Sequence, residues 1–111
     1  MNINDVSAQL DEIKSELVVF TSRNGLKVTA YLDSVTGRKA SSGYVIMAPK
    51  YGETKKNNLQ LAYYLAANGL AVLRFDHTNH VGESEGEITN FTFPGAIGDI
   101  RASIDYLEQR F

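Results

Sequence analysis

The first pattern of apolar residues in the chain has helical spacing. The residues recur at steps of four, three and four, so residues 4–15 are predicted to form a short amphipathic helix capped by Asn4 or Asp5. A leader without stable structure stays open as the alternative, because so short a helix is marginal without a tertiary partner. The apolar positions of this pattern are Val6, Leu10, Ile13 and Leu17.

The next two segments have the residue pattern of an antiparallel β-hairpin. Residues 17–22 and 26–33 are β-branched and apolar, and Arg23, Asn24 and Gly25 separate them. Asn-Gly is expected to supply the positive φ angles of a tight turn. The second segment alternates apolar and polar residues, which is typical of a sheet with one face in water. Its apolar positions are Leu26, Val28, Ala30 and Leu32.

From Tyr44 onward the pattern changes to nearly continuous apolar runs. Residues 44–48 and 70–75 are predicted to be parallel strands that are covered on both faces. Between them, residues 57–68 have helical spacing, and Asn68-Gly69 is a strong helix stop. The sequence therefore predicts a βαβ unit.

A loop rich in Gly, Glu, Ser and Thr follows Asp76, and after Pro94 the chain returns to helical spacing. The helix is expected to bury one apolar stripe and to turn its charged residues to the other side. The stripe is Ile97, Ile100, Ile104, Leu107 and Phe111, and the charged residues are Asp99, Arg101, Asp105 and Glu108. The whole pattern predicts one α/β domain over residues 1–111, with residues 1–16 as an amphipathic extension and residues 17–111 as the core.

Composition narrows the function classes. A chain of 111 residues with 43% apolar content has room for one modest core. Its 11 basic and 13 acidic residues are spread along the chain, so no positive field for nucleic acid is expected. The absence of cysteine excludes disulfides and fits a cytoplasmic location. Residues 1–17 are acidic, unlike a secretion signal, and no apolar run approaches the roughly 20 residues of a membrane span.

Two motifs carry a family resemblance. Residues 48–54, APKYGET, stand where α/β hydrolases have a His-Gly-x-Gly or Pro-Gly-x-Gly loop, and residues 75–84, FDHTNHVGES, resemble their Tyr-Asp-x-Arg-Gly-His-Gly-x-Ser segment. The chain resembles the N-terminal half of an α/β-hydrolase sheet. It is closest in texture to the bacterial luminescence acyltransferases, which act as acyl-carrier-protein thioesterases, and to related serine hydrolases.

The resemblance implies a serine-dependent enzyme that acts on an acyl ester or thioester without a cofactor. It implies that the backbone N–H of Tyr51 is one donor of the oxyanion hole. Lys50 and Glu53 depart from the family pattern, in which glycine is common at those positions. The family's nucleophile lies on a GxSxG turn after the next strand, so the chain alone is expected to be inactive. A plain strand-to-helix connection with an exposed tyrosine is the alternative.

Other chemistry is less well supported by the residues. Asp76, His77, His80 and Glu83 have the ligand types of a zinc or iron site, but the resemblance treats their segment as a turn beside the active site. The segment around Ser84 matches the GxSxG motif but lacks its structural context, because acidic residues flank the serine and no apolar strand directly precedes it. It is expected to lie in a turn.

Two further classes of function stay open. Asp76 ends a parallel strand, as the ribose-binding acid of a dinucleotide fold does, but the first loop lacks both GxGxxG and a P-loop. A non-catalytic half-domain is the stronger alternative. In the hydrolase order, residues 44–48 would form an open sheet edge, through which the chain would oligomerise or dock a complementary chain.

Overall fold

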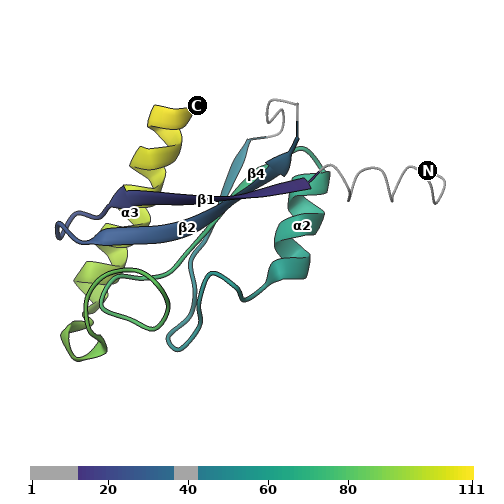
Figure 1. The fold of residues 1–111 in the computed structure, drawn as a ribbon. Helices are drawn as coiled ribbons and strands as arrows, with labels where there is room; N and C mark the ends of the chain where they lie inside the picture. Colours follow the sequence, from purple (N-terminus) through teal and green to yellow (C-terminus); the bar gives the residue numbers. More distant parts are fainter. Residues whose placement is uncertain (1–12, 37–42) are drawn as a thin grey trace.

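A computed structural model describes residues 13–36 and 43–111, and their fold is a mixed four-stranded sheet flanked by two helices (Figure 1). The strands lie in the order β1-β2-β4-β3. The elements are β1 (Ile13–Thr21), β2 (Lys27–Val35), β3 (Tyr44–Met47), α2 (Leu59–Ala67), β4 (Ala71–Phe75), the 3₁₀ turn η1 (Ile88–Asn90) and α3 (Phe93–Arg110).

Strands β1 and β2 form the predicted antiparallel hairpin, which pairs Thr21 with Lys27 at its closed end. The Gly25 N–H donates to the Ser22 carbonyl at 3.0 Å, and only Gly25 takes a positive φ, of 85°. The turn is therefore a three-residue loop ending in a left-handed glycine. The expectation that Asn24 would share the positive φ was wrong.

The start of β1 corrects another expectation. Residues 13–15, predicted as the end of a helix, are extended, and Ile13 pairs with Val35 in the ladder. Residues 13–16 of the predicted extension therefore belong to the sheet. Sheet pairing overrode the helical spacing, because Ile13 also packs against the apolar cluster below α2. The rest of that predicted helix lies outside the described residues.

The predicted βαβ unit is confirmed. Strand β3 pairs with β4 in parallel, Tyr44 opposite Ala71, and α2 connects them. Helix α2 covers one face of the sheet with Ala62 and Ala66 against Val72. Strand β3 is an edge strand within the described part of the chain.

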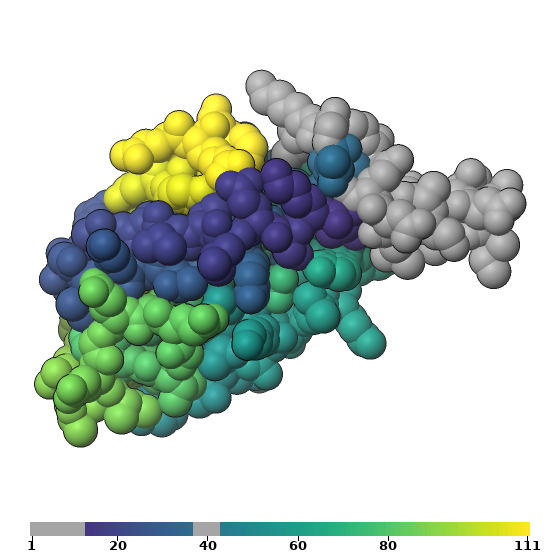
Figure 2. Space-filling model, in the orientation of Figure 1, coloured from purple at the N-terminus to yellow at the C-terminus, as the bar shows by residue number. Residues whose placement is uncertain are grey.

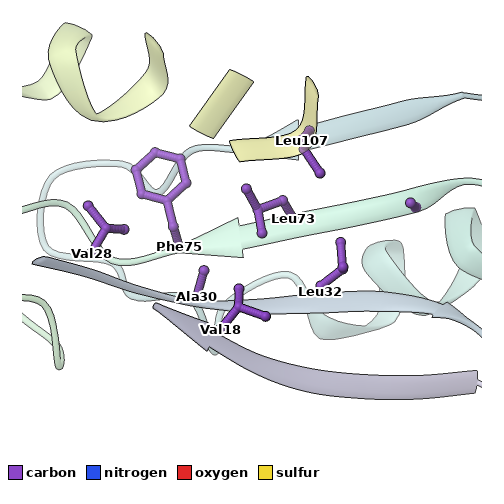
Figure 3. Packing of buried hydrophobic residues seen from close by; sticks show 8 residues of the cluster. Val18, Val28, Ala30, Leu32, Leu73, Phe75 and Leu107 are labelled. Carbon is purple, nitrogen blue, oxygen red and sulfur yellow. The ribbon is translucent and has the colours of Figure 1, made fainter. Parts of the chain in front are cut away.

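The larger apolar core lies on the other face of the sheet, under α3 (Figure 3). The inward positions of β2 are the alternating residues that the sequence predicted, and Leu73 and Phe75 of β4 meet them. Leu107 of α3 closes the cluster from above. The buried members are Val18, Val28, Ala30, Leu32, Ala71, Leu73, Phe75 and Leu107.

Helix α3 is rotated from the predicted orientation: Ile100 and Leu107 of the predicted stripe pack in the core, but other members of the stripe do not. Asp99, expected on the solvent side, is completely buried, whereas Ile97 is 52% and Ile104 43% exposed. Asp99 is buried because Ser22, His77 and Thr78 supply hydrogen bonds to its carboxylate. The apolar stripe of the helix is consequently left partly open beside β3.

Candidate functional site

The turn that carries Tyr51 follows the carboxyl end of β3. The Glu53 N–H donates to the Lys50 carbonyl at 2.9 Å, and Gly52 has a φ of 87°. These features define a type II turn with Tyr51 at its second position and Gly52 at its third. Glycine at Gly52 makes the turn possible, since other residues are strained at that φ. The carboxyl ends of β3 and β4 lie at the same edge of the sheet because the two strands are parallel.

Within the described residues, Tyr51 is the member of this turn whose N–H has no intramolecular acceptor. The Lys50 N–H donates to the Glu53 carboxylate at 3.0 Å, and the Gly52 N–H donates to His80 at 2.9 Å. Tyr51 itself is 69% exposed. The turn thus contains, in an exposed residue, one backbone N–H that the described residues leave without an acceptor.

His80 joins the loop after β4 to this turn. Its Nε2 accepts the Gly52 N–H, and its ring centroid lies 4.8 Å from that of Tyr51. Phe91 packs against both rings, at 5.1 Å from His80 and 5.4 Å from Tyr51. Burial and then the neighbouring His77 hold the pKa of His80 below its usual value, and Asp76 offsets this only in part.

Asp76 lies immediately after β4 and organises the loops on both sides. Its carboxylate accepts the backbone N–H of Lys55 at 2.6 Å, the ammonium of Lys55 at 2.8 Å and the Glu83 N–H at 2.8 Å. Burial opposes the charge of Lys55, but its hydrogen bonds to Asp76 and Glu83 outweigh this and raise its pKa. This ion pair ties the segment after β3 to the segment after β4.

A second buried ion pair continues this network into the sheet. Arg74 binds Asp33 with two nitrogens, at 2.7 and 3.0 Å, and donates to the Lys55 carbonyl at 2.8 Å. The ring of Tyr31 lies beside both cations, 5.1 Å from Arg74 and 5.3 Å from Lys55. Sequence reasoning missed this pair. The signal was the charge of Arg74 inside the otherwise apolar strand β4, whereas Asp33 stood among the polar residues of β2 and gave none.

On the α3 side, Asp99 anchors the loop after β4. It receives hydrogen bonds from the Ser22 hydroxyl at 2.6 Å, the Thr78 N–H at 2.9 Å and the His77 ring at 2.9 Å. Burial alone would raise the pKa of Asp99, but the bonds from His77, Ser22 and Thr78 outweigh it and lower that pKa. His77 therefore has a structural partner.

Ser84 is engaged by backbone groups. Its hydroxyl donates to the Asp76 carbonyl at 2.6 Å and accepts the Thr29 N–H at 2.8 Å. Figure 2 shows the green segment that contains it lying against the blue β1–β2 hairpin, where the Glu85 N–H also donates to the Lys27 carbonyl at 2.9 Å. Ser84 thus pins the loop to β2, as expected for a turn residue rather than a nucleophile.

The four residues considered as metal ligands are each bound to another group of the chain. Asp76 and Glu83 share Lys55, His77 binds Asp99 and His80 accepts from Gly52. Among the described residues, no group of three such side chains is placed to hold a metal. The same pairing removes Asp76 from the role of a ribose-binding acid.

The sheet order, the parallel βαβ unit and the turn after β3 are those of the N-terminal half of an α/β-hydrolase sheet. The esterase Pf2001 of Pyrococcus furiosus shares it, with a TM-score of 0.72 at 22% identity over 100% of this chain and 41% of that chain. The α/β hydrolase GrgF from Penicillium matches with a TM-score of 0.71 at 21% identity over 86% of this chain and 32% of that one. At these identities the likeness concerns the fold alone.

The sequence specifies the family more closely. The family model described as acyl transferase matches residues 38–111, and the chain belongs to that family. The acyl transferase of Photobacterium leiognathi is 39% identical over 77 residues, which are 56% of this chain and 24% of the relative. That of Photorhabdus laumondii is 35% identical over 66 residues, which are 60% of this chain and 22% of the relative.

The chain thus matches about a quarter of the length of these curated relatives. In the described residues, neither helix has the combination of length and apolarity that a membrane crossing requires.

Proposed function

We propose that this chain is the N-terminal part of a serine-dependent acyl transferase or acyl hydrolase that acts on an ester or thioester. In this proposal the Tyr51 N–H is one donor of the oxyanion hole. The observation that carries it is the Tyr51 N–H, which has no acceptor among the described residues and belongs to an exposed residue of the turn that follows a parallel strand. Membership of the acyl transferase family supports the acyl substrate. The cytoplasmic location rests only on the absence of cysteine.

The chemistry explains why a backbone N–H matters here. Attack on an acyl carbon moves negative charge onto the carbonyl oxygen, and fixed N–H donors stabilise that charge without reorganising. In α/β hydrolases a second donor comes from the residue after the nucleophile. The Tyr51 turn is fixed by Glu53 on one side and by His80 on the other, which suits this role.

The nucleophile, acid and base are proposed to come from a polypeptide segment other than residues 1–111. The one GxSxG match surrounds Ser84, whose hydroxyl is held by Asp76 and Thr29. We expect that a fluorophosphonate probe will not label the 111-residue chain. Labelling of Ser84 would overturn this part of the proposal.

The oxyanion role can be tested with a matched pair of variants. Proline is favoured at the second position of a type II turn, so Tyr51→Pro removes the N–H while keeping the turn. Tyr51→Ala keeps the N–H and removes the ring. Both would be placed in a chimera in which this chain replaces the matching segment of the Photobacterium leiognathi relative.

We expect Tyr51→Pro to lower kcat for ester and thioester substrates by about 10²–10³-fold, the cost of one oxyanion donor. Tyr51→Ala is expected to retain kcat within about tenfold, because the hydrogen bond is made by the backbone. Equal losses in the two variants, with both chimeras folded, would contradict the oxyanion role of the Tyr51 amide.

A second candidate is a half-domain that binds through its open edge. Beside the edge strand β3 lies an apolar groove of about 560 Å³, lined by Tyr44, Ile46, Ile104, Leu107, Glu108 and Phe111. An unpaired apolar edge favours association with another strand. Light scattering after size exclusion tests this: concentration-dependent dimers would support it, and a stable monomer at high concentration would oppose it.

A further inference from the structure

We propose that His80 is a positioning residue, whose unprotonated Nε2 holds the Gly52 peptide and thereby fixes the turn that presents the Tyr51 N–H. That the turn serves catalysis rests on the proposed function. That His80 fixes the turn rests on the described contacts between the two loops. No sequence motif pairs these loops, since Gly52 and His80 are 28 positions apart.

The first step concerns the tautomer of His80. A ring nitrogen that accepts an N–H bond carries no proton, so the neutral ring has its proton on Nδ1. The Gly52 N–H donates to Nε2 at 2.9 Å. His80 Nδ1 is buried and has no hydrogen-bond partner among the described residues, and the residue is 6% exposed. The ring is therefore oriented by Gly52 and by its aromatic neighbours.

The second step concerns the peptide between Tyr51 and Gly52. Type I and type II turns differ in the orientation of this central peptide, and the positive φ of Gly52 belongs to type II. A flip to type I would turn the Gly52 N–H away from His80 and swing the Tyr51 carbonyl across the turn. The hydrogen bond to His80 therefore selects the orientation that is present. Packing of the Tyr51 ring against His80 reinforces that selection.

The third step is the pH dependence that this arrangement imposes. A doubly protonated imidazole has no acceptor, so protonation of His80 removes the bond to Gly52. The titratable groups that face His80 are His77 and Asp76 from its own segment and Tyr51 from the turn. Burial and His77 keep the pKa of His80 below its usual value of about 6.5. The turn is then held at neutral pH and released in acid.

Nuclear magnetic resonance on the ¹⁵N-labelled 111-residue chain tests this without any substrate. We expect His80 to carry its proton on Nδ1 at pH 7 and to show a scalar coupling between its Nε2 and the Gly52 nitrogen. The amide shifts of Tyr51 and Gly52 should titrate with the same midpoint as His80. His77 serves as a comparison, because its Nδ1 lies 2.9 Å from Asp99, whereas the hydrogen bond to the turn is made by His80.

Two variants separate the acceptor from the ring. His80→Gln places a side-chain oxygen near the position of Nε2 and does not titrate, whereas His80→Phe keeps the ring and lacks an acceptor. We expect hydrogen exchange of the Gly52 amide to speed up about five- to tenfold in His80→Phe, the loss of one modest hydrogen bond. His80→Gln should retain slow exchange and lose the pH dependence of the Gly52 shift.

A proton on Nε2 of His80 at pH 7, or a Gly52 amide that does not follow its titration, would overturn the inference. So would equal exchange rates in the two variants. The wild-type titration decides the matter even if His80→Phe does not fold. None of these measurements uses acyl transfer, so a failure of the Tyr51→Pro experiment would be distinguishable from a failure of this one.

Discussion

The ammonium of Lys55 lies 2.8 Å from Oδ2 of Asp76, and their side chains are 1% and 0% exposed. Lys55 belongs to the segment that leads from β3 to α2, and Asp76 directly follows β4. The pair therefore connects the two loops that form the candidate site. A buried charge is stable only while its partner is present, because the desolvation of both ions is offset by their mutual attraction.

Asp76→Asn is consequently expected to destabilise the chain by about 3–5 kcal/mol, since it leaves the Lys55 ammonium buried without a counter-charge. Urea unfolding followed by circular dichroism measures this loss. The double variant Lys55→Met with Asp76→Asn should lose less than the sum of the two single changes, because it removes both charges together.

Glu83→Gln is the control for this experiment. Glu83 also contacts the Lys55 ammonium, but its side chain is 60% exposed. Water screens such a contact, so Glu83→Gln should lower the free energy of unfolding much less than Asp76→Asn does. Comparable losses for the two carboxylates would show that burial does not set the strength of this network.

Much of the fold could be predicted because it depends on local patterns. The alternation through Val28, Ala30 and Leu32 identified the buried face of β2, and the apolar runs around Asn68-Gly69 identified the parallel unit. The start of β1 could not be read in the same way. Ile13 has helical spacing to Leu10 and Leu17, and only its pairing with Val35 decides that it is extended.

In the candidate site too, local features could be predicted and contacts between distant residues could not. The position of Tyr51 after a buried parallel strand could be predicted, because strand and loop are contiguous in sequence. The burial of Asp99 could not, because its partner Ser22 is 77 positions away. The pair of Arg74 and Asp33, 41 positions apart, is equally non-local. A prediction from helical periodicity places an aspartate on the surface. In the fold, an aspartate can be buried where other residues donate hydrogen bonds to its carboxylate.

Asp99 provides a pH-dependent prediction. Its pKa is lowered in the folded chain, so the folded state binds fewer protons than the unfolded state in acid. The stability that Asp99 contributes is present above its ordinary pKa of about 3.8 and is lost as the pH falls below it. Asp99→Asn should cost about 2–4 kcal/mol at neutral pH, because bonds from Ser22, His77 and Thr78 lose their charged acceptor.

The free energy of unfolding measured between pH 2 and 7 tests this assignment. Below about pH 4 the curves of the wild type and Asp99→Asn should begin to converge, since the carboxyl of the unfolded wild type then takes up a proton and the folded one follows at lower pH. Parallel curves over the whole range would mean that Asp99 is not a source of the acid sensitivity.

Gly82 is expected to tolerate no side chain. Its φ is 114°, and a Cβ would lie 2.5 Å from both Cγ and Oδ2 of Asp76. Gly25 is the matched control, because it also has a positive φ but an added Cβ there would meet nothing within 4 Å. Gly25→Ala should cost about 1–2 kcal/mol for the left-handed backbone alone.

Gly82→Ala should cost about 1–3 kcal/mol more than Gly25→Ala, because the new methyl group also displaces the Asp76 carboxylate. Thermal unfolding of both variants gives the difference. If the two losses were equal, the close packing of the loop around Asp76 would be contradicted.

The orientation of α3 can be tested with two changes on neighbouring turns. Leu107 is 4% exposed within the core under the sheet, whereas Ile104 is 43% exposed at the groove beside β3. Leu107→Ala should cost about 2–5 kcal/mol, because it leaves a cavity. Ile104→Ala should cost less, about 1–1.5 kcal/mol, since only part of its apolar area is withdrawn from water there.

Low protein concentration is required for this comparison, because self-association through the groove would add its own stabilisation to the Ile104 side chain. A loss at Ile104 as large as that at Leu107 in a monomeric sample would mean that α3 buries the apolar stripe predicted from the sequence. Such a result would contradict the orientation in which Asp99, Ala102, Ser103 and Leu107 are the buried residues of the helix.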